Sequence, residues 1–202
     1  ENPGDDLTSV LVHAEIDGSK LSEQDLASFF ILLVVAGNET TRNAISHGMK
    51  ALCDYPEQRK LWRDDFEGVS RSAVEEIVRW ASPVNYMRRT VLRDSEIRGQ
   101  QVKEGEFLTL FYASANRDED VFEEPFRFDI TRHPNRHLGF GTGEHFCLGA
   151  HVARMSARAL IEEIGARVES LEYAGDPSQI HSSFVVGLKT LPVRYKLRSR
   201  RT

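Results

Sequence analysis

The sequence predicts a mainly α-helical protein with small β-sheets, an α+β fold, on three observations. A stretch without proline runs through residues 23–53 and predicts one long helix. A second helix is predicted over residues 148–165, after a glycine-rich loop. Short runs rich in aromatic and β-branched residues at 86–92 and 107–112, with glycines between them, predict strands that form only small sheets.

Composition and charge exclude several classes of protein. With 26 Lys+Arg against 31 Asp+Glu, the 202-residue chain lacks the basic excess that nucleic-acid binding needs. Its longest apolar run, residues 29–36, is far shorter than the roughly 20 residues of a membrane span. Two cysteines make no disulfide framework, and the polar start does not resemble a secretory signal. We therefore expect a cytoplasmic protein with no nucleic-acid partner and no membrane span.

The first helical elements follow from local signals. Residues 1–20 predict a short helix between loops, and Ser22 and Asp25 have capping-box spacing at the start of the long helix. Residues 29–36 are apolar on every side, so we expect this segment to be buried all round in the centre of a molecule. Because 202 residues supply little to surround it, we expect a piece of a larger protein that exposes an apolar patch when alone.

The remaining elements alternate helices, irregular chain and short strands. Residues 57–80 predict two helices joined near Gly68 and Ser70. Residues 113–145 form a long irregular stretch whose aromatic residues indicate that it is packed and functional. Strand pieces are expected near residues 168–173 and 184–196.

Cys147 ends a glycine-rich run, Phe140-Gly-Thr-Gly-Glu-His-Phe-Cys147-Leu-Gly149, directly before a predicted helix. A helix N-terminus stabilises a thiolate, the glycines allow close approach of a flat group, and Phe140 and Phe146 can shield the sulfur. The pattern indicates a metal-binding thiolate. The alternatives are a buried structural cysteine and a zinc site, although the spacing is not a recognised zinc pattern; that zinc site would use His133, His137, His145 and Cys147.

The run is similar to the haem-binding signature of the cytochrome P-450 family, Phe-x-x-Gly-x-x-x-Cys-x-Gly. The resemblance implies haem b with Cys147 as its axial thiolate ligand. It also implies a cytochrome P-450 fold, of which residues 1–202 form a single C-terminal part with the long central helix and the ligand loop, the N-terminal half being absent. The cofactor contacts that it implies come from Ala36, Gly37, Arg89, Phe140, Gly141, His145, Cys147 and Gly149.

Glu76-Ile-Val-Arg79 places an acid and a base three residues apart on one helix face. Taken alone, such a pair is usually an exposed ion pair of little energetic value. Here it resembles the Glu-x-x-Arg helix motif of the family, which implies a structural role in holding the cysteine loop. The resemblance further implies a third partner from the irregular stretch, and Arg127 fits that place.

The segment Ala36-Gly-Asn-Glu-Thr-Thr41 lies inside the long predicted helix. A carboxylate and hydroxyls next to an apolar run are costly unless they are used, although a satisfied polar kink is the alternative. The segment resembles the Ala-Gly-x-(Asp/Glu)-Thr-Thr pattern of the family. That resemblance implies that Glu39 and Thr40 are catalytic and manage proton delivery to bound dioxygen.

Two cationic positions match family positions that hold the haem propionates. They are His145, two residues before Cys147, and Arg89 on the predicted strand at 86–92. Arg88 is the neighbouring candidate, and the alternation of side chains along a strand allows only one of the two arginines to face the cofactor.

The resemblance implies a haem-dependent monooxygenase that hydroxylates a lipophilic small molecule with O2 and electrons from a redox partner. The chain has no flavin or iron–sulfur signature, so electrons must come from a partner, and the resemblance implies a ferredoxin-type donor. Residues 36–42, 82–90 and 184–193 look like the corresponding segments of soluble actinobacterial hydroxylases of steroid side chains and methyl-branched lipids. The alternative is a truncated, non-catalytic fragment of such an enzyme that does not bind haem stably.

Overall fold

The computed structural model describes residues 4–198, in two compact units, Glu1–Glu39 and Thr40–Thr202. The helices are α1 Leu7–His13, α2 Glu23–Asp54, α3 Pro56–Asp64, α4 Phe66–Ala81, α5 Tyr112–Ala115, the 3-10 turn η1 Gly143–His145, and α6 Ala150–Arg167. The strands are β1 Glu15–Ile16, β2 Ser19–Lys20, β3 Tyr86–Thr90, β4 Ser95–Ile97, β5 Gln100–Val102, β6 Phe107–Phe111, β7 Val168–Tyr173, β8 Ser178–Gln179, β9 Leu188–Thr190 and β10 Val193–Leu197. This helix-rich content with small sheets confirms the predicted fold class.

The long helix α2 begins as its sequence predicts. The hydroxyl of Ser22 accepts the backbone N–H of Asp25 at 3.1 Å, and the Asp25 carboxylate accepts from the hydroxyl and backbone N–H of Ser22 at 2.6 and 3.3 Å. This reciprocal pair satisfies N–H groups that the first helical turn leaves without partners. The helix continues to Asp54, just before Pro56, whose ring would interrupt it.

The apolar segment of α2 differs from its prediction. Among the described residues 29–36 none is buried, and Val34 is 67% exposed. In its described residues, the first unit supplies only α1, the β1–β2 hairpin and this part of α2, which is too little chain to surround a helix on all sides. The expectation of all-round burial is therefore wrong for this chain, and the exposed side chains agree with the apolar surface expected of the chain alone.

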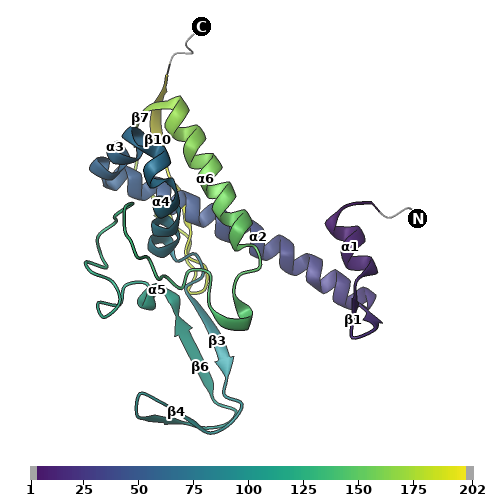
Figure 1. The fold of residues 1–202 in the computed structure, drawn as a ribbon. Helices are drawn as coiled ribbons and strands as arrows, with labels where there is room; N and C mark the ends of the chain where they lie inside the picture. Colours follow the sequence, from purple (N-terminus) through teal and green to yellow (C-terminus); the bar gives the residue numbers. More distant parts are fainter. Residues whose placement is uncertain (1–3, 199–202) are drawn as a thin grey trace. The chain divides into compact units, whose positions relative to one another are not determined.

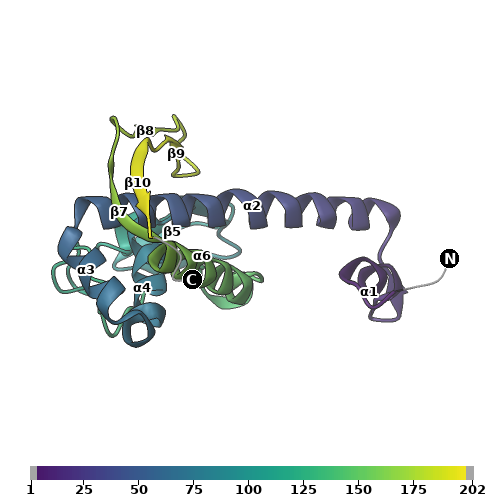
Figure 2. The same ribbon diagram turned by 90° about the horizontal axis from the view of Figure 1, so that it is seen from above.

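The core of the second unit forms where the end of α2 meets α3, α4 and α6. Figures 1 and 2 both show α4 beside α6, and the core also takes Phe128 and Ile130 from the irregular stretch. A Cβ on Gly48 of α2 would lie 2.9 Å from a methyl carbon of Ile77 on α4, so this glycine permits close helix packing. The core cluster comprises Ala44, Ala51, Leu52, Trp62, Val69, Ala73, Ile77, Ala81, Phe128, Ile130 and Ile161.

The boundary between α3 and α4 lies earlier than predicted. It falls at Asp65, not near Gly68 and Ser70, and both of those residues are inside α4. The reason is a cap: a carboxylate oxygen of Asp65 accepts the N–H of Gly68 at 3.1 Å and starts the helix there. At the other end, α4 closes on Ser82, whose φ is +39°, directly before Pro83.

The strands pair in two-stranded antiparallel sheets, which are β1–β2, β3–β6, β4–β5, β7–β10 and β8–β9 among the described residues. Figure 1 shows β3 and β6 extending from the helices with β4 at their far end, and Figure 2 shows β7 beside β10. The β4–β5 hairpin was not predicted, because its short strands carry little apolar alternation. It turns at Arg98 and Gly99, both with positive φ.

Candidate functional site

The cysteine loop lies between the irregular stretch and α6. Cys147 is half-buried, and its backbone N–H donates to the carbonyl of Phe140 at 2.9 Å, which closes the loop. Gly141 and Gly143 have φ of +71° and +69°, a left-handed conformation that residues with side chains rarely adopt. The sequence therefore folds into a tight turn that ends immediately before the first turn of α6.

The surroundings of Cys147 fit a flat, apolar metal complex. Its sequence neighbours Phe146 and Leu148 are both exposed, the latter by 79%, so the residues before and after Cys147 present apolar side chains on the protein surface. Among the described residues, a Cβ on Gly149 would meet no atom within 4 Å. A soft thiolate ligand among apolar side chains and open space is the donor set that haem takes from a cysteine.

The zinc alternative fails on geometry. Within residues 4–198, no three or more His, Cys, Asp or Glu side chains gather where they could hold a metal ion. His133, His137, His145 and Cys147 therefore do not form a zinc site. A haem iron needs only one protein ligand on the thiolate side, so this result is compatible with haem.

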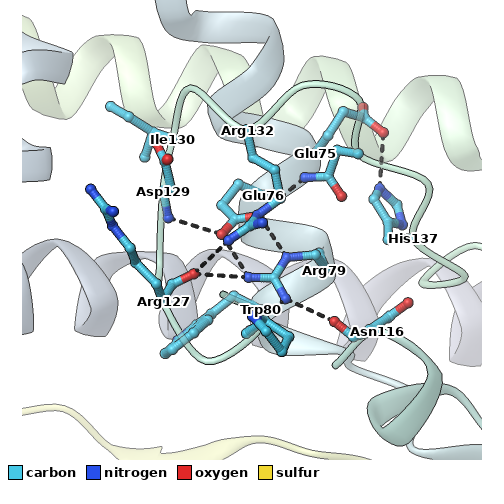
Figure 3. A network of polar contacts seen from close by, with 12 residues as sticks. Glu75, Glu76, Arg79, Trp80, Asn116, Arg127, Asp129, Ile130, Arg132 and His137 are labelled. Atoms are coloured by element: carbon cyan, nitrogen blue, oxygen red, sulfur yellow. Dashed lines mark hydrogen bonds and ion pairs between the residues drawn. The ribbon is translucent and has the colours of Figure 1, made fainter. Parts of the chain in front are cut away.

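Behind the loop, α4 carries a buried ion pair. The side chains of Glu76 and Arg79 are both 0% exposed, and Arg79 donates to the two Glu76 oxygens at 2.7 and 2.8 Å (Figure 3). The three remaining Arg79 N–H groups donate to the carbonyls of Asn116, Pro125 and Arg127 at 2.8, 2.8 and 3.1 Å. All five donors of the guanidinium are thus used, which is what its burial requires.

The Glu76 carboxylate also accepts hydrogen bonds from the irregular stretch. It accepts from the backbone N–H of Asp129 at 2.9 Å, from Arg132 Nε at 3.2 Å and from Asn135 Nδ2 at 3.1 Å. The third charged partner is therefore Arg132, and the expectation of Arg127 is wrong. The Arg127 side chain is exposed and pairs with Glu124, while only its backbone carbonyl joins the network (Figure 3).

The same helix touches the start of the cysteine loop. A Cβ on Gly139 would lie 2.6 Å from Val78 Cγ1 on α4, so only glycine fits there without displacement. The neighbouring backbone N–H of Leu138 donates to Asn116 Oδ1 at 2.7 Å. Through these contacts the buried network of α4 fixes where the loop that carries Cys147 begins.

The two candidate arginines of β3 lie on opposite faces of the strand. The Arg88 guanidinium stacks on the ring of Phe107, 4.1 Å from its centroid. Arg89 is half-buried and donates to the carbonyl of Arg88 at 2.9 Å. Arg88 thus has an aromatic partner of its own, which favours Arg89 as the cofactor contact. His145 is exposed at the end of η1.

The predicted residues divide between the two units. Phe140, Gly141, His145, Cys147 and Gly149 come together in one loop of the second unit. The Ala36–Thr41 motif lies on α2, where Ala36, Gly37 and Glu39 belong to the first unit and Thr40 begins the second. Glu39 and Thr40 are half-buried, whereas Ala36 and Gly37 are exposed.

Sequence reasoning missed a cationic groove of about 940 Å³ between α4, the segment 131–136 and α6. Among the described residues that line it, the only acidic side chain is Glu75. These residues come from three separate segments, and no local pattern in the sequence connects them. The basic side chains that line the groove are Arg71, Arg132, His133, Arg136, His151, Arg154 and Arg158.

A cysteine loop before a helix, fixed by a buried Glu–Arg pair on a second helix, defines a class of proteins that hold haem through a thiolate. Comparison with known proteins agrees. The family profile described as Cytochrome P450 matches residues 69–196. This chain belongs to the cytochrome P450 family.

Two groups of characterised relatives are similar over nearly all of the chain. A methyl-branched lipid omega-hydroxylase of Mycobacterium tuberculosis is 55% identical over 195 residues, which cover 96% of this chain and 46% of the relative. A steroid C26-monooxygenase of Rhodococcus jostii is 46% identical over 198 residues, covering 98% of this chain and 41% of the relative. The chain spans somewhat less than half the length of these relatives.

Solved structures show the same fold. A cytochrome P450 of Mycobacterium marinum in complex with pseudoionone is 49% identical, with a TM-score of 0.91 over 95% of this chain and 46% of that one. A Bacillus megaterium structure in complex with corticosterone is 38% identical, with a TM-score of 0.89 over 95% of this chain and 52% of that one. Separately, no helix among the described residues is long and apolar enough to cross a membrane.

Proposed function

We propose that the intact protein is a haem-dependent monooxygenase that hydroxylates a lipophilic small molecule. The observation that carries the proposal is the position of Cys147, half-buried among exposed apolar side chains in a tight loop before α6 of a cytochrome P450 fold. When bound, haem supplies the activation of O2 that no amino-acid side chain can provide. Cys147 is the residue that would hold the iron.

The residues around Cys147 have supporting roles in this proposal. Phe140 and Phe146 lie with ring centroids 6.4 Å apart and would supply the apolar side chains beside the iron ligand. Gly141 and Gly149 would leave the backbone of the loop free of side chains for the approach of a flat macrocycle. Arg89 and His145 would supply basic partners for its propionates. Ala36 and Gly37 of α2 are two further proposed cofactor contacts, and both are exposed.

Glu39 and Thr40 are the proposed catalytic residues of the chain. They are adjacent on α2, and both are half-buried, whereas residues 34–38 before them are exposed. A carboxylate beside a hydroxyl can hold an ordered water and pass a proton along it. We assign proton delivery during oxygen activation to this pair.

The relatives suggest the substrate class. Two of the similar relatives are named methyl-branched lipid omega-hydroxylase and steroid C26-monooxygenase. We propose a substrate of the same kind, a branched aliphatic chain that is free or attached to a steroid. Difference spectra of the intact protein with both compound types, followed by product analysis, would decide between them.

The electron donor is proposed to be a ferredoxin-type protein that docks at the cationic groove. The chain as a whole has a net charge of −5, yet the groove gathers basic side chains around one carboxylate. This local reversal of charge suits an acidic partner and speeds its encounter. Arg71 and Arg136 are exposed at the groove and are the groups to change.

Charge reversal tests this docking site. Arg71→Glu and Arg136→Glu should each raise the donor concentration needed for half-maximal reduction, with a weaker salt dependence. Reduction by dithionite should stay normal in both. Arg93→Glu is the matched control, because Arg93 is exposed but does not line the groove. Equal effects of all three substitutions would contradict docking at the groove.

The haem assignment is tested by comparing the two cysteines. Burial raises the pKa of the Cys53 thiol above its ordinary value, which disfavours the thiolate that iron needs. Cys147→Ala should abolish the thiolate spectrum of the reduced, carbon-monoxide-bound intact protein, and Cys53→Ala should keep it. The opposite pattern would overturn the assignment of Cys147.

The catalytic assignment is tested by uncoupling. Thr40→Ala in the intact protein should consume reduced cofactor and release peroxide without matching product, because the water that carries the proton loses its hydroxyl partner. Thr41→Ala, the adjacent hydroxyl on the same helix, is the control and should remain coupled. Product formed per reduced cofactor oxidised measures the effect, and an unchanged ratio in Thr40→Ala would contradict the role.

A second proposal concerns the 202 residues by themselves, which we expect to bind haem weakly or not at all. The observation that favours it is an exposed apolar stripe of Leu148, Val152 and Met155 that runs from the ligand loop along α6. A site with this much uncovered apolar surface exposes its cofactor to water. Haem titration of the 202-residue chain beside the intact protein would measure the difference.

A further inference from the structure

A second polar cluster on α4 lies beside the buried ion pair. Glu75, next in sequence to Glu76, accepts from Arg154 of α6 at 2.6 and 2.9 Å and from His137 Nε2 at 3.0 Å. The His137 side chain is only 3% exposed, whereas Glu75 and Arg154 are partly open to the cationic groove. Three segments far apart in the sequence are therefore joined at one carboxylate, and Figure 3 shows the Glu75–His137 contact.

Both partners of Glu75 also contact residues of the cysteine loop. His137 Nδ1 accepts the backbone N–H of Gly139 at 3.1 Å, so the ring proton lies on Nε2 and is donated to Glu75. The Arg154 guanidinium lies over the ring of Phe140, 4.5 Å from its centroid, and the His137 ring is 5.8 Å from that ring. Phe140 in turn accepts the N–H of Cys147 through its carbonyl.

Arg154 also brings a positive charge to the cysteine loop. Hydrogen bonds to Glu75 raise the pKa of Arg154, so its guanidinium stays a cation, and that cation lies over the ring of Phe140. The carboxylate of Glu75 offsets part of this positive charge. The cluster thus combines a mechanical contact with the loop and a fixed charge over Phe140, the residue whose carbonyl accepts the N–H of Cys147.

We propose that Glu75, His137 and Arg154 form a positioning unit for the Cys147 loop that also sets the reduction potential of the iron bound there. The proposal rests on the proposed function, in which Cys147 ligates haem. Arg154 supplies a positive charge that favours the added electron, and Glu75 moderates it. His137 and Arg154 hold Phe140, and through its carbonyl the backbone of the ligand, in place.

Charge and packing roles predict different signs. Removing the Arg154 cation should lower the reduction potential, because an added electron loses a favourable interaction. Removing the Glu75 anion leaves that cation less compensated and should raise the potential. If the cluster served only for packing, the two variants would not shift the reduction potential in opposite directions, since both would loosen the same loop.

The experiment uses the intact protein loaded with haem and reduced chemically, without an electron donor protein. Midpoint potentials are measured for Glu75→Gln, Arg154→Gln and Arg154→Lys. We expect an upward shift, a downward shift and a value near the original, respectively, because lysine keeps the charge. Glu67→Gln and Arg158→Gln are matched controls: this pair also joins α4 to α6, but Arg158 lies near Phe66 instead of Phe140. Neither control should move the potential.

The outcomes separate this inference from the proposed function. If the unmodified protein shows no thiolate spectrum, the proposed function fails, and the inference fails with it. If that spectrum is present and the two glutamine variants shift the potential in the same direction, or no further than the controls, only the inference is overturned. If Arg154→Gln does not fold, Glu75→Gln and Arg154→Lys still decide: an unshifted Glu75→Gln or a displaced Arg154→Lys contradicts it.

Discussion

Two helices of this protein reverse the usual relation between polarity and burial. On α4, Glu76 and Arg79 carry full charges and are completely buried. On α2, Ile31, Val34 and Val35 are apolar and mostly exposed. The difference lies in the partners that the described chain supplies: α4 has a hydrogen-bond partner for each donor of its arginine, and the apolar half of α2 has too few neighbouring elements.

The local sequence therefore shows which side chains of a helix need hydrogen-bond partners or apolar neighbours. Residues far away in the sequence determine whether those partners are present. The carbonyls of Asn116, Pro125 and Arg127 make burial of Arg79 possible, although they follow it by 37 to 48 residues. The predictions below are ordered from the largest expected change in stability to the smallest, and each tests one side of this contrast.

The largest effect should come from breaking the buried pair. Arg79→Ala leaves the Glu76 carboxylate buried without its main cation, a loss of about 3–5 kcal/mol in the free energy of unfolding. We expect mostly insoluble protein or protein without haem. Soluble yield, haem content and melting temperature of the intact protein are the measurements.

Arg127→Ala is the control for that substitution. The Arg127 side chain is exposed, and only its backbone carbonyl binds Arg79, so removal of the side chain should change stability by no more than about 0.5 kcal/mol. If the two variants lost similar stability, the side chain of Arg127 would belong to the network and the assignment of Arg132 would be wrong.

The next largest effect is the loss of folding stability at low pH that we expect when Glu75 becomes protonated. Burial raises the pKa of Glu75, but hydrogen bonds from Arg154 and His137 outweigh it and lower the pKa from 4.5 to about 2. Because the folded-state value is depressed, the stabilisation is complete above about pH 4.5 and is lost as pH falls towards 2. A shift of this size corresponds to about 2–3 kcal/mol for a partly open group.

Denaturant unfolding over a pH series measures this contribution. The stability difference between the unmodified protein and Glu75→Gln should shrink steadily between about pH 4.5 and pH 2. Glu67→Gln removes a mostly exposed carboxylate; it is the control and should change stability by no more than about 0.5 kcal/mol. A difference for Glu75→Gln that did not vary with pH would show that the carboxylate charge adds no stability there.

A smaller loss of stability is expected from a substitution at the contact between α4 and the cysteine loop. Gly139→Ala would place a methyl group 2.6 Å from Val78 Cγ1, and relieving that overlap should cost about 1–3 kcal/mol. Adding Val78→Ala should recover most of the loss. Gly175→Ala, where the nearest carbon is at 3.6 Å, is the control and should be nearly neutral. Additive losses in the double variant would mean that the two residues do not press on each other.

The contrast between the two helices also shows how much the sequence could predict. The capping box at Ser22, the helix-rich class and the Glu76–Arg79 pair were predictable, because each depends on residues a few positions apart. Arg132 could not be distinguished from Arg127, since both arginines lie in the same irregular stretch and only the packing of Phe128 and Ile130 places them. The cluster around Glu75 was missed because it joins α4, α6 and the loop through tertiary contacts.

The smallest change in stability is expected for substitutions in the exposed apolar segment of α2. Val34→Lys replaces an apolar side chain that is 67% exposed, so the unfolding free energy of the 202-residue chain should stay within about 0.5 kcal/mol of its original value. Its self-association should nevertheless fall, because contiguous exposed apolar side chains promote association and a charge among them opposes it. Met155→Lys makes the same change on α6 and tests whether the second exposed stripe also contributes. Light scattering with intact mass measures both effects, and a monodisperse monomer of 22.9 kDa before any substitution would show that the exposed apolar segment of α2 does not drive association.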